Sequence, residues 1–450
     1  MVYLQKRPYP LMKIKLIPIV ALLFAFSASA QQINTADLDR LFDSLAVHNK
    51  SMASVLLTHK GQKVYERAIG YAVIDSAHSI NATPQTHYRI GSITKTFTAT
   101  MIMQLVEEKK LSLDSHLDKY LPAIPNAGQI TIEMMLRHRS GIHNLTDDDA
   151  YWKSQTEPRT RAQMLAVFTK SKPDFNPDAE AKYSNTGYIL LGYIIEDVTK
   201  KPYERNLQER ILSRLGLKNT SFGGKIDPAR GDAYSYSFSK RWEKREETDL
   251  SQPAGAGAIV STPGDVLKFI NALFSGKLVS QQSLTQMTKI VDIFGIGLAP
   301  TPFYQRKGYG HTGGVDGFQT IATYFPGDSL AGAVFSNGAD YPLNDILIAM
   351  LSAYYKVPVI IPDFNAMQLS PEEAERYVGV YESKQIPLKV TISCKDNKLF
   401  FQPTGQPTFL LAFVKKDTFK IDTVGVTMEF RPEQKEATIT QAGQAFLFTK

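Results

Sequence analysis

Cysteine is nearly absent from this 450-residue sequence, in which Cys394 is the only one. A single cysteine excludes an intramolecular disulfide framework and any zinc site built from several cysteines. Cys394 lies in a segment of alternating apolar residues, and we interpret it as a small buried residue rather than a nucleophile. The sequence also lacks a strand-flanked Gly-x-Gly-x-x-Gly motif and a phosphate-binding loop, so we expect no nucleotide, flavin, haem or other cofactor.

A strong excess of one charge is missing as well. The formal net charge is +7, but residues 1–30 contain four of the 51 basic residues and none of the 44 acidic ones. The remaining small excess does not indicate a nucleic-acid partner. Hydrophobic residues make up 43% and charged residues 21%, which excludes a disordered chain and a multi-span membrane protein.

Long apolar runs are scarce, and the clearest, Leu16–Phe26, lies near the beginning of the sequence. Lys13 and Lys15 precede it, and Ser-Ala-Ser-Ala at 27–30 follows, which is the order of segments in a secretory signal. The run is short for a helix that spans a bilayer, so we predict a signal peptide over residues 1–30 and a secreted, periplasmic protein. A membrane anchor is the alternative, and we expect membrane contact only through an uncleaved signal.

A change in composition near Val357–Asp363 divides the mature chain. Two prolines and several β-branched residues in this segment favour an extended linker over a helix. Apolar and polar residues then alternate over Leu388–Cys394, and further short strand-like runs follow. Short strands at close spacing favour a small antiparallel β-barrel or sandwich. We therefore predict one domain over residues 31–360 and a second over residues 366–450.

The first of these domains contains both strand-like and helical patterns. Residues 55–66 are predicted to form a β-hairpin, and helical periods cover residues 93–108, 188–199 and 266–275. Two runs between residues 320 and 335 again have the pattern of strands. Strands at both ends with helices between them are typical of an α+β, or mixed α/β, domain.

The first chemical motif is Ser92-Ile93-Thr94-Lys95, which opens a segment of helical apolar period. A serine at a helix start lies near free backbone N–H groups, and a lysine three residues later lies on the same side of the helix. The helix dipole and a desolvated lysine both favour ionisation of the hydroxyl. Ser-x-x-Lys alone is a weak signal, because Ser237 and Lys240 match it without that context. The alternative is an ordinary helix cap with a solvated lysine.

Two further motifs follow in order along the chain. Tyr183-Ser184-Asn185 precedes a helical segment, and His311-Thr312-Gly313-Gly314 precedes the late strands. Ser-x-x-Lys, Tyr-x-Asn and Lys/His-Thr-Gly in this order resemble the signature set of the penicillin-recognising serine hydrolases. The sequence is most similar to the branch that contains class C β-lactamases, serine D,D-carboxypeptidases and related esterases.

Other segments carry the same resemblance. Residues 135–142 resemble that family's Leu-Leu-x-His-x-Ser-Gly segment, and residues 254–262 resemble its small-residue strand before a helix. The resemblance covers residues 35–350, and the tail beyond residue 366 resembles the lipocalin-like domain often attached to these enzymes. It implies a β-lactamase/transpeptidase-like antiparallel sheet flanked by helices, followed by a small antiparallel β-barrel domain.

The resemblance also implies a role for each motif. Ser92 would attack a carbonyl and form an acyl-enzyme, with Lys95 and Tyr183 sharing its proton. Tyr183 would carry the proton to the leaving group, with its pKa held low by Lys95. Asn185 would orient Lys95 and hold the substrate amide. The backbone N–H groups of Ser92 and Gly314 would form an oxyanion hole.

The strand with the motif His311-Thr312-Gly313-Gly314 would bind substrate at its edge, because its glycines let a substrate approach closely and pair like an added strand. β-Lactamases usually have a lysine at the position of His311, whereas a histidine is mostly neutral near pH 7. We therefore predict an exported serine hydrolase, a D,D-carboxypeptidase, D-amino-acid peptidase or esterase, acting on small peptides or esters, peptidoglycan-derived peptides among them. The alternatives are a β-lactamase acting on lactams and a non-catalytic penicillin- or cell-wall-binding protein.

A metal site is a further alternative. His138 and His143 lie near the acidic run at 147–149, but their spacing matches no helical His-x-x-x-His face. The acidic run follows Asn144-Leu145-Thr146 as in a solvated loop, and the resemblance places His138 beneath the active site. We therefore expect no metal.

Two aromatic pairs, Tyr151-Trp152 and Phe303-Tyr304, are candidate walls of the substrate cleft, with exposed loop packing as the alternative. The sequence indicates no oligomeric state, and it does not decide between Met1 and Met12 as the start of the protein.

Overall fold

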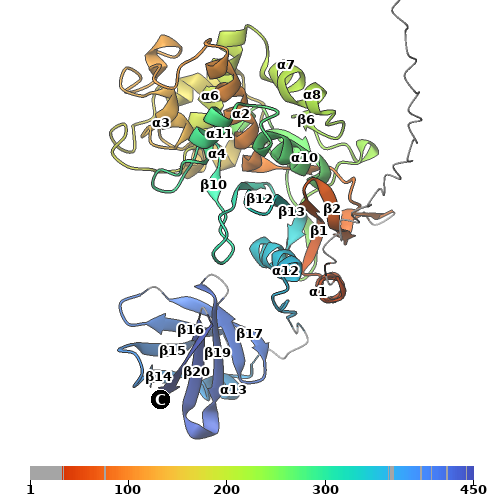
Figure 1. Ribbon diagram of the computed structural model, residues 1–450, viewed down its shortest axis with the longest axis vertical. Coiled ribbons are helices and arrows are strands. Elements are labelled where there is room, and N and C mark those ends of the chain that lie inside the picture. The colour runs from red at the N-terminus through yellow and green to blue at the C-terminus, as the bar shows by residue number, and fades with distance from the viewer. Residues whose placement is uncertain are drawn as a thin grey trace, which may run out of the picture. The chain divides into compact units, whose positions relative to one another are not determined.

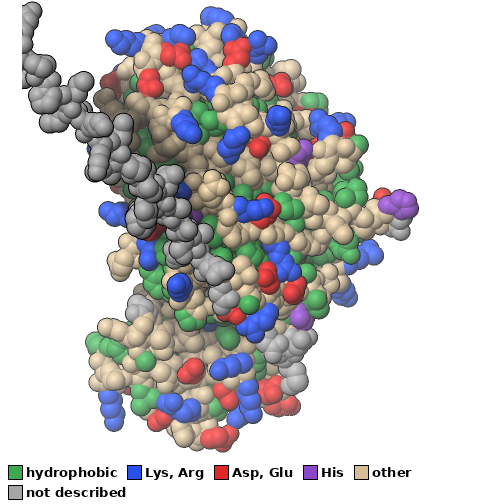
Figure 2. Space-filling view, turned by 45° about the vertical axis from the view of Figure 1, so that its right-hand side comes forward, with side chains coloured by type: hydrophobic (Ala, Val, Ile, Leu, Met, Phe, Trp, Pro, Cys, Tyr) green, Lys and Arg blue, Asp and Glu red, His purple; other side chains and the backbone are tan. Residues whose placement is uncertain are grey.

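The computed structural model describes residues 33, 35–75, 78–362, 364, 369–395, 398–406, 408–421, 424–441 and 443–450. The predicted signal peptide lies outside these residues. The chain divides into Met1–Gln32 and Ile33–Lys450, and only the second unit is described below. In the described ranges, no helix combines the length and the hydropathy that a membrane span needs. On the face in Figure 2, basic and acidic side chains are interspersed, as the small net charge suggests.

A six-stranded antiparallel sheet organises the first domain (Figure 1). Its order is β10 (Ala299–Pro300), β11 (Tyr309–Val315), β12 (Phe318–Phe325), β13 (Leu330–Ala339), β1 (Ser51–His59) and β2 (Gln62–Ile69). The first long strand therefore pairs with the last, with Ser51 opposite Ala339 and His59 opposite Leu330. The predicted hairpin over 55–66 and the two late strands are confirmed, each somewhat longer than predicted.

Helices cover both faces of this sheet. On one face, α1 (Ala36–Val47) and α12 (Leu343–Tyr355) pack with Val55 and Leu57 of β1. On the other face, α10 (Pro263–Phe274) packs with Leu56 in the core that most of the other helices of this region share. Alternate side chains of β1 thus enter two different cores, and this explains why the strand is buried almost throughout.

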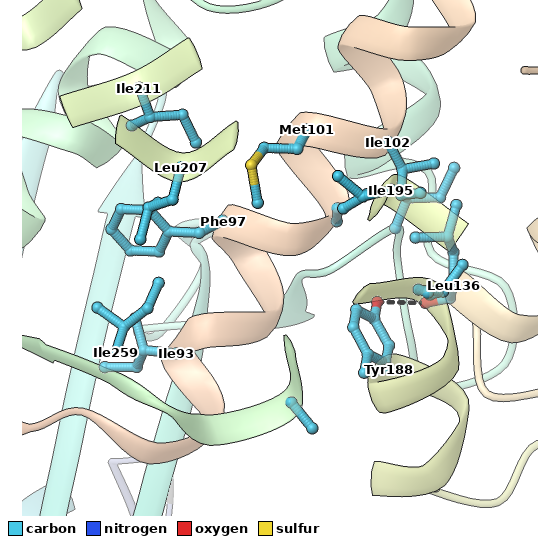
Figure 3. Packing of buried hydrophobic residues seen from close by; sticks show 14 of the residues in the cluster. Ile93, Phe97, Met101, Ile102, Leu136, Tyr188, Ile195, Leu207, Ile211 and Ile259 are labelled. Carbon is cyan, nitrogen blue, oxygen red and sulfur yellow. Dashed lines mark hydrogen bonds between the residues drawn. The ribbon is translucent and has the colours of Figure 1, made fainter. Parts of the chain in front are cut away.

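The helical region is built around α2 (Thr94–Glu107), which is buried on all sides over most of its length. Figure 3 shows Phe97, Met101 and Ile102 of α2 inside this core, together with Ile195 of α6 (Asn185–Thr199). Phe97 stacks on Phe269 of α10 with 3.7 Å between the ring centroids. Because α2 is surrounded by other elements, residues on its first turn are held rigidly.

The remaining elements of this domain are short. The helices are α3 (Ile132–Leu136), α4 (Asp149–Ser154), α5 (Arg161–Phe168), α7 (Tyr203–Leu207), α8 (Ser213–Leu215), α9 (Ala254–Gly257) and α11 (Gln281–Thr288). The strands are β3 (Tyr71–Val73), β4 (Ile80–Asn81), β5 (Tyr88–Arg89), β6 (Ser221–Phe222), β7 (Tyr236–Phe238), β8 (Trp242–Lys244) and β9 (Ile259–Ser261). A Cβ on Gly255 of α9 would lie 3.1 Å from the Cα of Gly192, so glycines let α9 and α6 approach closely.

The C-terminal region begins with α13 (Pro371–Glu375), which is capped by Ser370. It continues as a closed antiparallel barrel of β14 (Gly379–Glu382), β15 (Lys389–Lys395), β16 (Lys398–Pro403), β17 (Phe409–Lys415), β18 (Thr418–Ile421), β19 (Val426–Arg431), β20 (Glu436–Gln441) and β21 (Gln444–Thr449). The predicted alternation is confirmed in β15, where Val390 and Ile392 are buried between exposed neighbours. Cys394 is half-buried against the barrel core rather than fully buried.

Candidate active site

Ser92 lies in a short 3₁₀ turn, Gly91–Ile93, that leads directly into α2. The capping position of α2 belongs to Ile93, so the Ser92 hydroxyl does not cap this helix. Gly91 has a φ of +51°, and a Cβ on it would lie 2.7 Å from the backbone nitrogen of Gly314. The serine turn and β11 are therefore in backbone contact, and only a glycine permits this approach.

Lys95 is fully buried, and three oxygen atoms surround its amine. Nζ lies 3.0 Å from Ser92 Oγ, 2.7 Å from Asn185 Oδ1 and 2.8 Å from the carbonyl oxygen of Ala256. Burial lowers the pKa of Lys95 well below its usual value, because the charged form is no longer solvated by water. The alternative of a solvated lysine is therefore wrong. The neutral form of the Lys95 amine is favoured beside Ser92.

Tyr183 approaches the same serine from the segment before α6. Burial raises the pKa of its phenol, and a hydrogen bond with Ser92 opposes that shift only in part. The resemblance implied a low pKa for Tyr183, and this implication is wrong because desolvation of a phenolate outweighs the neighbouring groups. The ring is held in place by His138, at 4.5 Å between centroids, and its centroid lies 4.8 Å from Lys95 Nζ.

Asn185 is the first residue of α6, whose N-terminus is capped by the Ser184 hydroxyl. Its side-chain amide donates to Asn144 Oδ1 at 3.2 Å and to Thr146 Oγ1 at 3.2 Å, and its backbone N–H donates to Asn144 Oδ1 at 2.9 Å. Its Oδ1 accepts from Lys95. Asn144 and Leu145 are buried against the start of α6, whereas Asp147 and Asp149 of the acidic run that follows are exposed, as predicted for a solvated loop.

The predicted strand motif forms β11, alongside the serine turn. His311 is buried, and burial is the main reason that its pKa is lowered to about 4. Its Nδ1 lies 2.6 Å from the carbonyl oxygen of Thr312, which requires Nδ1 to carry the proton and donate. Thr312 and Gly314 are exposed at this edge. The structure thus gathers all eight predicted residues around one serine: Ser92, Lys95, Tyr183, Asn185, His311, Thr312, Gly313 and Gly314.

Gly313 sets how closely β11 approaches the serine turn. A Cβ at this position would lie 2.0 Å from the carbonyl oxygen of Ile90 and 2.5 Å from Thr320 Oγ1. We expect Gly313→Ala to displace the strand and to slow fluorophosphonate labelling of Ser92 by about a hundredfold, the usual cost of a misplacement near 1 Å. Gly327→Ala is the matched control, because a Cβ on Gly327 meets no atom within 4 Å. Equal labelling rates in the two variants would contradict this account.

Arg89 and Asp316 form a buried ion pair that the sequence analysis missed. Arg89 Nη1 donates to Asp316 Oδ2 at 2.9 Å and to the carbonyl oxygen of Thr248 at 2.8 Å. Arg89 precedes Ser92 by three residues and Asp316 follows Gly314 by two, so the pair joins the two segments that meet at the serine. The available signal was a charged residue between Tyr88 and Ile90 in a segment predicted to lie at the site, because buried charges require a partner.

The other predicted positions lie in different surroundings. His138 Nδ1 accepts from the Ser184 backbone N–H at 3.1 Å, whereas His143 bridges Asp148 and Asp174 in a separate cluster. Among the residues that the structure describes, no three His, Cys, Asp or Glu side chains are grouped to hold a metal ion.

Of the two aromatic pairs, Phe303 is buried and Tyr304 is exposed. Tyr151 is half-buried near Asp316, and burial together with that carboxylate raises its pKa to about 12. Trp152 is largely exposed. Phe294, which the sequence did not single out, packs on His138 and Tyr183 with 4.7 and 6.0 Å between centroids. The second Ser-x-x-Lys motif lies apart, in the β7–β8 hairpin, where Ser237 and Lys240 are exposed.

The chain is similar to several known proteins. A family model described as Beta-lactamase matches residues 38–353. A penicillin-binding protein of Bacillus subtilis (strain 168) is 24% identical over 423 residues, covering 87% of this chain and 93% of the relative. A teichoic acid D-alanine hydrolase of Staphylococcus aureus (strain MRSA252) is 29% identical over 212 residues, covering 47% of this chain and 52% of the relative. A solved structure of a D-amino acid amidase from Ochrobactrum anthropi SV3, complexed with L-phenylalanine, has a TM-score of 0.64 and 26% identity. The match covers 71% of this chain and 99% of the amidase.

Proposed function

Because the chain belongs to the Beta-lactamase family of serine hydrolases, we propose that it cleaves amide or ester bonds through an acyl-enzyme on Ser92. The observation that carries the proposal is the 3.0 Å contact between Ser92 Oγ and the buried amine of Lys95. A neutral amine has two N–H bonds and one lone pair. Asn185 Oδ1 and the Ala256 carbonyl oxygen accept hydrogen bonds from these two N–H groups. The lone pair then faces the Ser92 hydroxyl.

In the proposed acylation step, Lys95 takes the Ser92 proton as Oγ bonds to the substrate carbonyl carbon. The backbone N–H groups of Ser92 and Gly314 stabilise the negative charge that develops on the carbonyl oxygen. The Tyr183 phenol, which is protonated because burial raises its pKa, gives a proton to the leaving group. The proton held by Lys95 returns to Tyr183, and the bond to the leaving group breaks. Water then attacks the carbonyl carbon of the acyl-enzyme through the same proton transfers, and the acid is released as the bond to Ser92 Oγ breaks.

The substrates that we propose are D-amino-acid peptides or small esters, which makes the protein a D,D-carboxypeptidase, a D-amino-acid peptidase or an esterase. Relatives named for D-amino acid amides and for D-alanine of teichoic acid support this chemical class. The neutral His311 supports it too, because the site offers no permanent cation there for the carboxylate of a penicillin. Export to the periplasm, with small cell-wall peptides as substrates, is part of the same proposal.

Turnover of paired stereoisomers tests the proposed function. D- and L-phenylalanine amide, and the matching methyl esters, are incubated with the protein beside benzylpenicillin. We expect hydrolysis of the D isomer to exceed that of the L isomer by at least about tenfold in kcat/KM, and a slowly hydrolysed penicilloyl adduct at most. Rapid penicillin turnover would favour the β-lactamase alternative. No turnover of any ester or amide by the folded protein would favour the non-catalytic binding protein.

The pH dependence of selectivity tests the role of His311. Since the pKa of His311 is lowered to about 4, the side chain is neutral above about pH 5 and gains a charge only on further acidification. The titration of Lys95 changes the kcat/KM of every substrate by the same factor, so it cancels in the ratio of two kcat/KM values. We expect the kcat/KM ratio of a D-Ala-D-Ala peptide to its C-terminal amide to stay flat above about pH 5 and to rise about tenfold as the pH falls toward 4. A midpoint near the usual histidine pKa would contradict this account.

A further inference from the structure

A series of hydrogen-bonded side chains leads from the protein surface to the amine of Lys95. Asn144 Nδ2 donates to Asp147 Oδ1 at 2.7 Å and to Thr146 Oγ1 at 2.8 Å. Asn144 Oδ1 accepts from Asn185, and Asn185 Oδ1 accepts from Lys95. Asn144 is buried, whereas Asp147 is exposed and pairs with Lys182 at 3.0 Å. This hydrogen-bonded series therefore connects the solvated carboxylate of Asp147 with the buried amine of Lys95 beside Ser92.

Each link of this series has a fixed direction. An ionised carboxylate only accepts, so Asp147 holds the amide nitrogen of Asn144 toward itself. A backbone N–H only donates, so the N–H of Asn185 holds the amide oxygen of Asn144 on the opposite side. Both constraints give Asn144 the same orientation, and its oxygen then attracts the amide nitrogen of Asn185. The oxygen of Asn185 is left to face Lys95.

The charge of Asp147 agrees with this direction. Burial opposes its ionisation, but hydrogen bonds from Lys182 and Asn144 outweigh that effect, so the pKa of Asp147 lies below its usual value. The carboxylate is therefore ionised at neutral pH and remains an acceptor. If the side-chain amide of Asn185 were rotated by half a turn, its NH₂ group would face the N–H groups of Lys95. The Lys95 amine would then lose a fixed hydrogen-bond acceptor.

We propose that Asn144 is a positioning residue, which fixes the amide of Asn185 and thereby holds the lone pair of Lys95 on the Ser92 hydroxyl. Asn144 touches neither Ser92 nor Lys95 and acts through Asn185. The inference rests on the proposed function, because it assigns Asn144 a part in activating that serine. It adds a residue from a loop that lies 41 positions before Asn185 in the chain.

The experiment compares Asn144→Leu, Asn144→Asp and the wild type, with Asp149→Asn as the matched control at the exposed first residue of the nearby helix α4. A fluorophosphonate is the probe, and intact mass gives both the labelled fraction and the rate constant of labelling per active molecule across the pH range. Tyr183, Tyr188, His138 and His311 are the other titratable groups that face Lys95, and all four are unchanged in these variants.

We expect Asn144→Leu to lower the rate constant about tenfold, the effect of one lost hydrogen bond near a charged group. We also expect the acid limb of its pH profile to move to lower pH, because the ammonium form of Lys95 loses a fixed acceptor. In Asn144→Asp, one oxygen of the new carboxyl group takes the place of the amide nitrogen beside Asp147. Because two carboxylates cannot both ionise at that distance, we expect this carboxyl to keep its proton and donate it to Asp147. Its other oxygen still accepts from Asn185, so the rate constant returns to within about threefold of the wild type. Asp149→Asn stays within about twofold.

Three results would overturn the inference. The first is an unchanged rate constant in Asn144→Leu. The second is a lower labelled fraction with an unchanged rate constant and pH profile, which is the signature of a purely structural role. The third is an equal loss in the Leu and Asp variants. If the folded wild type carries no adduct on Ser92, the proposed function itself fails, and this inference fails with it.

Discussion

In the Lys95→Met variant, the rate of acylation at Ser92 is expected to fall by about a hundredfold to ten-thousandfold, the range attributed to a positioned proton acceptor. Methionine has nearly the length and volume of lysine but offers no lone pair to the Ser92 hydroxyl. The amine that it replaces is fully buried and lies 3.0 Å from Ser92 Oγ. Burial lowers its pKa, so the wild-type amine is available as a base near neutral pH.

Stopped-flow measurement of an activated D-amino acid ester gives the acylation rate for this test. Lys240→Met is the matched control, because Lys240 ends the second Ser-x-x-Lys motif, in the exposed β7–β8 hairpin. Its rate is expected to equal that of the wild type. The Lys95→Met protein should still show the unfolding transitions of the wild type, since removal of a buried amine also removes its desolvation cost. A Lys95→Met variant that acylates at the wild-type rate would exclude Lys95 as the base.

The second large effect is on stability. Arg89→Met is expected to lower the free energy of unfolding by about 3–5 kcal/mol, because the buried carboxylate of Asp316 loses its counter-charge. Both side chains of this pair are almost inaccessible to solvent, at 3% for Arg89 and 1% for Asp316. Asp316 then retains only the hydrogen bond from the Thr248 backbone N–H, at 2.8 Å, among the contacts described here.

Urea unfolding measures this effect, and two further variants interpret it. The double variant Arg89→Met with Asp316→Asn removes the orphaned charge and should recover at least half of the loss. Arg205→Met breaks an exposed pair with Glu209 and should cost less than about 1 kcal/mol. Because the Arg89–Asp316 pair joins the serine turn to the end of β11, Arg89→Met should also slow labelling of Ser92. A stability loss as small as that of Arg205→Met would contradict this description of the pair.

Much of the candidate site could be predicted from the sequence, because three short motifs resemble, in their order along the chain, the signature set of a known family. Ser92 and Lys95 are three residues apart, so a helix brings them together wherever it lies. Tyr183 and Asn185 share one motif at the start of α6. The strands of the barrel were similarly predictable, since the period-two pattern of Leu388–Cys394 is a local property.

The features that the sequence did not reveal depend on tertiary contacts. Asn144 follows the pattern of a polar loop, and only the backbone N–H of Asn185, 41 positions later, explains its burial. Arg89 and Asp316 are 227 positions apart, a separation at which no local pattern specifies a partner. The direction of the Tyr183 pKa shift is likewise set by desolvation in the folded site, which no motif encodes.

Intact-mass analysis after exposure to a fluorophosphonate tests the central claim most directly. The wild type, Ser92→Ala and Ser237→Ala are compared, each shown to be folded by its unfolding transition. The account predicts one covalent adduct on the wild type and on Ser237→Ala, and no adduct on Ser92→Ala. An adduct that persists in Ser92→Ala, or a folded wild type that forms none, would contradict the assignment of Ser92 as the nucleophile.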